Sequence, residues 1–102
     1  MSRHSEESEK AIEAYLVELA RREGFLALKW YSTVCVGYPD RLVLLPGGKT
    51  FWIELKSKGE KPRQLQEMCI RRLRDLGQTV YVCDSREAVL QAVREQQGKQ
   101  TE

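Results

Sequence analysis

Apolar residues near the start of the chain recur at spacings of three and four, as they do on one face of an α-helix. Within residues 8–23 this stripe consists of Ile12, Tyr15, Leu16, Leu19 and Ala20. Gly24 follows it, and glycine commonly ends a helix. The next segment, Phe25–Tyr31, is rich in aromatic and aliphatic residues and is predicted to form a strand. Residues 32–39 are less regular and are expected to form a loop.

Two short apolar runs, Arg41–Leu45 and Thr50–Leu55, flank a proline- and glycine-containing turn and predict a β-hairpin. The length of the turn decides which side chains share a face. A three-residue turn, Pro46–Gly48, would place Asp40 opposite Glu54 on one face of the hairpin. A two-residue turn would send Asp40 to the other face. The chemistry described below favours the longer turn.

The second half of the chain predicts two helices separated by one strand. Pro62 opens the first of these helices and Gly77 closes it, with an expected buried face of Leu65, Met68, Cys69, Leu73 and Leu76. Residues Thr79–Cys83 are expected to form the fourth strand. Asp84 and Glu87 lie three apart, which is a capping-box pattern for a last helix.

The predicted order is therefore α-β-β-β-α-β-α, an α/β fold with a central mixed sheet flanked by helices. We expect one domain over residues 1–102, with an ordered core of about 8–95 between polar termini.

No apolar run approaches the ~20 residues needed to cross a bilayer, so no membrane association is expected. The start, MSRHSEESEK, lacks the apolar stretch of a secretory signal, and three scattered cysteines indicate reduced thiols. A cytoplasmic location is expected.

The formal net charge of +2 is small, but its distribution is uneven. Residues 25–84 carry ten basic and six acidic side chains, with basic residues concentrated in 56–63 and 71–74. Such a patch could contact phosphates, and it could equally be a solvated helix face. The only histidine, His4, lies in the polar N-terminal tail. A catalytic triad and a histidine-ligated zinc site are therefore excluded, which leaves carboxylates, lysine and a bound metal.

Three charged residues interrupt the apolar pattern of the hairpin: Asp40, Glu54 and Lys56. Strand alternation places Glu54 and Lys56 on the same face. Two opposed carboxylates repel each other, and a divalent cation between them would remove that cost. Hard oxygen ligands select Mg²⁺ or Mn²⁺, and a nearby lysine could orient or deprotonate an attacking water. An ordinary cross-strand Glu–Lys pair is the alternative.

The segment Gly37-x-Pro39-Asp40, the hairpin, Glu54-x-Lys56 and a following helix with Gln66 resemble the PD-(D/E)xK nuclease superfamily. More closely, the chain resembles the short stand-alone VRR-NUC proteins of bacteria and phages, from about Glu9 to Val93. The resemblance implies a restriction-endonuclease-like core. It also implies a metal-dependent endonuclease, similar to Holliday-junction resolvases, that cuts branched DNA as a homodimer in DNA repair or in a phage. Flap, nick or duplex specificity is an alternative, and so is a DNA-binding module without activity.

The same resemblance implies roles for individual residues. Asp40, Glu54 and the Leu55 carbonyl would bind Mg²⁺ or Mn²⁺, Lys56 would act on the water or the transition state, and Gln66 would steady the site. An acidic residue of the first helix would complete the metal site, and we prefer Glu9 over Glu13. The expected DNA-binding residues are Arg41, Lys56, Lys58, Lys61 and Arg63. Three aromatic residues, Trp30, Tyr31 and Trp52, could stack on bases, but packing between sheet and helices is favoured for them.

Overall fold

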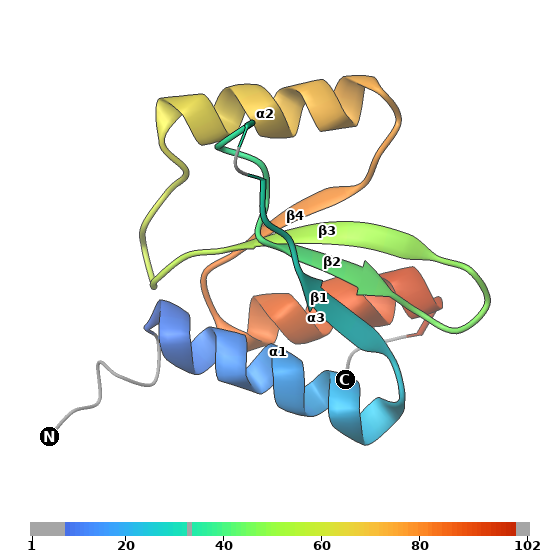
Figure 1. Cartoon of the computed structure of the whole chain (residues 1–102). Helices are drawn as coiled ribbons and strands as arrows, with labels where there is room; N and C mark the ends of the chain where they lie inside the picture. The colour runs from blue at the N-terminus through green and yellow to red at the C-terminus, as the bar shows by residue number, and fades with distance from the viewer. Residues whose placement is uncertain (1–7, 33, 100–102) are drawn as a thin grey trace, which may run out of the picture.

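The computed structural model describes residues 8–32 and 34–99 of the chain, so His4 lies outside the described residues. The elements are α1 (Glu9–Glu23), β1 (Leu26–Lys29), β2 (Arg41–Leu44), β3 (Thr50–Leu55), α2 (Gln64–Asp75), β4 (Val80–Cys83) and α3 (Arg86–Gln97) (Figure 1). This order confirms the predicted α/β arrangement. None of the helices in the described part of the chain is long and apolar enough to span a membrane.

The sheet has the strand order β1-β2-β3-β4. β1 and β3 both pair with β2 antiparallel, while β4 runs parallel to β3 after the crossover through α2. Arg41 pairs with Ile53, and the Leu45 N–H donates to the Lys49 carbonyl at 2.8 Å. These pairs confirm the three-residue turn. Gly47 and Gly48 both have positive φ there, which side chains disfavour.

The helices cover the two faces of the sheet unequally, with α1 and α3 on one face and α2 on the other (Figure 1). The core lies on the α1/α3 face and includes Ile12, Leu16 and Leu19 of α1, Val43, Phe51, Ile53 and Leu55 of the sheet, and Val89 and Val93 of α3. Burial of each such side chain contributes about 1.5–3 kcal/mol. Arg94 also binds Glu23 at 2.7 Å and joins α3 to α1.

The predicted buried face of α2 is wrong in part, since Cys69 and Leu73 are half-buried but the other three residues are exposed. Leu65, Met68 and Leu76 are 48%, 62% and 66% exposed, and Ile70 is the buried residue of the helix. The stripe turned toward the sheet runs instead through Gln66, Ile70 and Leu73. Gln66 donates a hydrogen bond to the buried Glu54 carboxylate of β3. This polar contact helps to set the rotation of α2 about its axis. Apolar periodicity in the sequence does not reveal such a contact.

Two further details differ from the predictions. The N-cap of α3 is Ser85, whose hydroxyl accepts from the Ala88 N–H at 3.0 Å, and Asp84 accepts from the Gly59 N–H instead. Tyr31 is 76% exposed and does not pack between sheet and helices. Trp30 and Trp52 contact each other edge-to-face, with ring centroids 5.6 Å apart.

Candidate active site

Glu54 is a charged side chain in an almost fully buried position, with only 4% of its surface exposed. Its Oε2 accepts a hydrogen bond from Gln66 Nε2 at 2.9 Å and faces Lys56 Nζ at 3.5 Å. Burying a carboxylate is costly unless it is paired and hydrogen-bonded. Both partners contact the same oxygen, so the second oxygen of Glu54 can face the site.

Asp40 directly precedes β2, and its backbone is held in place by β1, because the Trp30 N–H donates to the Asp40 carbonyl at 2.9 Å. Continuing the β2–β3 register by one residue brings Asp40 opposite Glu54, as predicted. The side-chain oxygen Oδ1 of Asp40 is buried and has no hydrogen-bond partner. A buried carboxylate oxygen without a partner is rare in native proteins, and a water, an ion or a ligand can satisfy it.

Both carboxylates have raised pKa values. Burial and then repulsion by Asp40 raise the pKa of Glu54 to about 7, and Lys56 opposes this shift. Burial also raises the pKa of Asp40, while the backbone N–H groups of Asp40 and Leu55 lower it. Carboxylates whose pKa values are shifted by burial and by a specific charged partner are typical of functional sites.

Lys56 follows β3 at the point where the strand leaves the sheet. Its N–H donates to the Cys83 carbonyl of β4 at 2.9 Å, which extends the parallel pairing and fixes the backbone. Its side chain is only 12% exposed and points toward Glu54. Leu55 lies between these two residues with its side chain in the core, so only its backbone can serve the site.

Glu9 and Glu13 lie one turn apart on α1 but have different surroundings. Burial and repulsion by Asp40 raise the pKa of Glu9, and Lys56 lowers it, which shows that Glu9 lies near both. Glu13 instead accepts from Arg41 at 2.6 Å and from Lys29 at 3.3 Å. These partners lower the pKa of Glu13 and occupy its Oε2.

Arg41 was expected to bind DNA, but its guanidinium is engaged within the protein. It donates to the Ala27 carbonyl at 2.7 Å and to Glu13, and its side chain is only 12% exposed. These contacts join β2 to β1 and α1. Arg41 therefore serves the packing around the site in this structure and does not present its charge to solvent.

A cleft opens beside these residues. It is lined by Glu9, Gly37, Lys56, Glu60, Lys61, Arg63, Leu65 and Gln66. The cleft thus brings together five residues predicted for the site or its DNA contacts: Glu9 of α1, Lys56 after β3, Lys61 and Arg63 of the loop before α2, and Gln66 of α2. Lys58 is exposed on the same loop, outside this lining. A phosphate entering the cleft would meet Lys61 and Arg63 on its way to Lys56.

The residues present fit a divalent cation held partly by the substrate. Among the described residues, no group of three or more His, Cys, Asp or Glu side chains is arranged as a metal site. Mg²⁺, however, is usually bound by one or two carboxylates with water and phosphate completing its shell. Asp40 Oδ1, which lacks a partner, and the opposed Glu54 carboxylate match that pattern.

Sequence reasoning missed three side chains around the site. The Ser57 hydroxyl accepts from the Glu9 N–H at 3.1 Å and so holds the start of α1 against the end of β3. Asp84 accepts from the Gly59 N–H at 3.0 Å and steadies the loop after Lys56. Glu60 lines the cleft. The position of Ser57 directly after Glu54-x-Lys56 is the only sequence signal for any of them.

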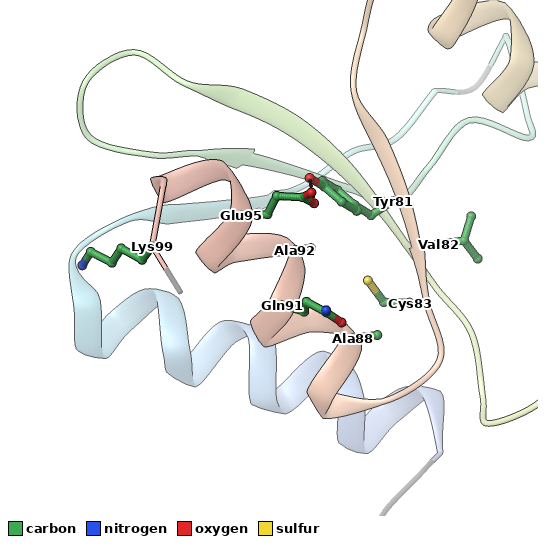
Figure 2. A pocket seen from close by; sticks show the side chains of 8 residues that line it. All are labelled: Tyr81, Val82, Cys83, Ala88, Gln91, Ala92, Glu95 and Lys99. Carbon is green, nitrogen blue, oxygen red and sulfur yellow. Dashed lines mark hydrogen bonds between the residues drawn. The ribbon is translucent and has the colours of Figure 1, made fainter. Parts of the chain in front are cut away.

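A second hollow lies between β4 and α3, away from the carboxylates (Figure 2). Tyr81 and Glu95 point toward each other across it, with a hydrogen bond of 2.7 Å, and Gln96 donates to the Tyr81 hydroxyl at 2.8 Å. Burial raises the pKa of the Cys83 thiol to about 12. The thiol is therefore protonated and unreactive at neutral pH.

Comparisons with known proteins identify the family of the chain. A model of the VRR-NUC domain family matches residues 2–87. "Putative nuclease p44" of Acyrthosiphon pisum secondary endosymbiont phage 1 is 44% identical over 87 residues, covering 83% of this chain and 94% of that protein. A solved VRR_NUC domain superposes with a TM-score of 0.77 at 30% identity, covering 84% of this chain and 94% of the other. The chain belongs to the VRR-NUC family of nuclease domains.

Proposed function

We propose that this protein is a divalent-metal-dependent endonuclease that hydrolyses phosphodiester bonds in branched DNA, with four-way (Holliday) junctions as the preferred substrate. The observation that carries the metal-dependent chemistry is the pair formed by the buried Glu54 and the half-buried Asp40, with the buried oxygen Oδ1 of Asp40 left without a partner. Such a pair is costly in a sheet unless a cation binds it.

In this proposal Asp40, Glu54, the Leu55 carbonyl and Glu9 hold Mg²⁺ or Mn²⁺. The bound ion would supply Lewis acidity toward the phosphate and lower the pKa of a water. Glu54 can offer the oxygen that Gln66 and Lys56 do not contact. Glu13 stays with Arg41, so α1 contributes Glu9 alone.

Lys56 is the residue proposed to act on the attacking water. Hydrolysis forms one bond from the water oxygen to phosphorus and breaks one P–O bond, so a proton must leave the water and another must reach the leaving oxygen. The Lys56 ammonium lies within 3.5 Å of Glu54, where it can orient the water and stabilise charge on the phosphate oxygens. Gln66 keeps Glu54 in position for this step.

Phosphate binding is proposed for Lys61 and Arg63, which line the cleft, and for the exposed Lys58 beside it. These contacts go to the DNA backbone and carry no sequence information. A preference for one DNA substrate over another would then come from the shape of the DNA, such as the shape of a branch. The exposed Trp30 and Tyr31 remain candidates for stacking on unpaired bases at a branch.

A homodimer would place two such sites on one junction, which is roughly two-fold symmetric. Two segments offer exposed apolar side chains for this contact: Leu26 and Leu28 on the edge strand β1, and Leu65, Met68 and Leu76 on α2. Each could bury apolar surface against its own copy. The proposed dimer uses one of these two faces.

The test is cleavage of labelled junction, flap and duplex DNA of matched sequence with Mg²⁺, Mn²⁺ or EDTA. Asp40→Asn and Glu54→Gln should abolish cleavage while the circular dichroism spectrum is unchanged. Glu67→Gln, which removes an exposed carboxylate of α2, is the matched control and should cut at the wild-type rate.

Cleavage in EDTA, or by either active-site variant, would overturn the metal site. Equal rates on all three DNAs would replace junction specificity by a general nuclease. Junction binding without cleavage under any metal would favour the DNA-binding module instead.

A further inference from the structure

We propose that Gly37 is a positioning residue of the active site, because it sets the distance between the loop that carries Asp40 and the helix that carries Gln66. The inference rests on the proposed function only for its effect on catalysis. Its structural part concerns the hydrogen bond between Gln66 and Glu54, which can be observed without any substrate.

The loop between β1 and β2 reaches across the sheet to α2 (Figure 1). At Gly37 this contact is very close. A Cβ added there would lie 2.9 Å from Cys69 Sγ, 3.0 Å from Leu65 Cγ and 3.3 Å from the Leu65 carbonyl oxygen. The first two distances are at or below the limit for real Cβ contacts, and the third involves the helix backbone itself. Only glycine allows this approach.

The same contact is reinforced by the thiol of Cys69, which donates to the Val36 carbonyl at 3.5 Å. Gly37 has a φ of 100°, a conformation that L side chains rarely adopt. Two independent features, the space and the backbone angle, therefore require glycine at this position.

The Gly37 contact lies close to a site residue on each side, Asp40 on the loop and Gln66 on the helix. Asp40 follows Gly37 by three residues, through the fully buried Pro39. On the helix side Gln66 follows Leu65 directly, and its side-chain oxygen Oε1 accepts from the Arg63 N–H at 2.9 Å. That bond orients the Gln66 amide so that its NH₂ group faces Glu54. Pushing α2 away from the loop would lengthen the Gln66–Glu54 contact first.

Few apolar side chains hold α2 at this distance, since Ile70 is its buried residue, and Arg74, whose Nη2 donates to the Val80 carbonyl at 2.6 Å, lies near the far end of the helix. A helix anchored by so few apolar contacts moves at small cost. A small change at the Gly37 contact is therefore expected to alter the geometry of the site, although Gly37 has no side chain of its own.

The chain offers a matched control. Gly77, at the other end of α2, has a φ of 88°, and a Cβ added there would meet nothing within 4 Å. Gly37→Ala and Gly77→Ala therefore introduce similar backbone strain, but only the first adds a contact with α2. Any difference between the two variants reports the contact.

The experiment measures the side-chain amide NMR signals of Gln66, which are assigned by their loss in Gln66→Ala. Gly37→Ala should shift these signals toward those of a free glutamine, and Gly77→Ala should leave them in place. Under single-turnover conditions with bound junction DNA and Mg²⁺, Gly37→Ala should cut roughly tenfold to 10²-fold more slowly, the loss expected for a misplacement of about 1 Å. DNA affinity should be unchanged.

Two further variants test the mechanism. Cys69→Ala in the Gly37→Ala background vacates the space of the thiol and should restore part of the signal and the rate. Gly37→Ala should add nothing to Gln66→Ala, because it acts through that residue. Should Gly37→Ala not fold, Cys69→Leu adds bulk to the same contact from the α2 side. Cys69→Ser, which keeps the size of the cysteine, is its control.

Unchanged Gln66 signals in Gly37→Ala, or equal shifts in Gly77→Ala, would overturn the positioning role while leaving the proposed nuclease function intact. The converse outcome is also distinct. If the wild type cuts no DNA but the Gln66 signals still move in Gly37→Ala alone, the proposed function fails and the positioning role stands.

Discussion

Glu13 and Arg41 are joined by a hydrogen bond of 2.6 Å between Oε2 and Nη2, and this pair separates the two acidic candidates of α1. The pair connects α1 to β2. Glu9, one turn earlier, makes its electrostatic contacts with Asp40 and Lys56. Glu13 is held by Arg41 and Lys29, although its charge also raises the pKa of Asp40, while Glu9 lines the cleft.

This division predicts opposite effects for two similar substitutions. Glu9→Gln should weaken Mn²⁺ binding in calorimetry by several-fold and leave stability unchanged, because it removes a proposed ligand. Glu13→Gln should leave metal binding unchanged and lower the free energy of unfolding by about 1–3 kcal/mol, since it leaves a half-buried Arg41 without its partner. The reverse pattern would move the metal site one turn along α1.

Glu54 predicts how the stability of the metal-free protein depends on pH. Its pKa is raised to about 7 in the folded chain, against about 4.5 when unfolded. The folded state therefore holds a proton that the unfolded state has released, and the resulting stabilisation is complete below pH ~4.5 and lost as the pH rises through 7. Thermal unfolding in EDTA should show a loss on the order of 2 kcal/mol between pH 5 and 8.

Glu54→Gln supplies the comparison, because it cannot titrate and should flatten this part of the profile. Mg²⁺ should stabilise the wild type more at pH 8 than at pH 5, since the ion competes with the proton. Parallel pH profiles for wild type and variant would contradict the raised pKa.

Lys56→Ala should affect chemistry more than binding. Loss of one phosphate contact weakens DNA affinity only modestly, whereas loss of a group that orients water or stabilises charge lowers the rate by roughly 10²–10⁴-fold. Single-turnover cleavage and fluorescence anisotropy separate the two effects. A collapse of binding with a normal rate at saturating protein would make Lys56 an electrostatic contact only.

The proposed dimer predicts about twice the chain mass in light scattering at micromolar concentration. Leu26→Glu tests the β1 face and Met68→Glu tests the α2 face, and the variant that yields a monomer identifies the interface. A wild-type monomer that cuts junctions one strand at a time would remove the resolvase proposal and leave a nickase or flap nuclease.

The sequence was most informative for features that follow from the number of residues in a strand or a turn. Once the expected chemistry had favoured the three-residue turn Pro46–Gly48, strand alternation placed Asp40 opposite Glu54, because one residue more or less reverses every side chain of a strand. The order of helices and strands followed from apolar periodicity for the same reason.

The rotation of α2 could not be predicted in this way. Its apolar side chains are distributed around much of the helix, and the side that meets the sheet is selected by the polar pair Gln66–Glu54. The partners of Glu13 were equally hidden, since Lys29 and Arg41 lie 16 and 28 residues away. Such contacts depend on how distant elements meet, and no periodic pattern encodes that.

The turn between β2 and β3 has a practical consequence for modifying this protein. It lies at the opposite end of a six-residue strand from Glu54, about 17–20 Å away along the chain for a strand of this length. Gly47 and Gly48 border open space. A dye, an affinity peptide or a new pair of chain ends introduced between them would leave the cleft clear. This turn is therefore the natural attachment point for tethering the nuclease to a surface or to another protein.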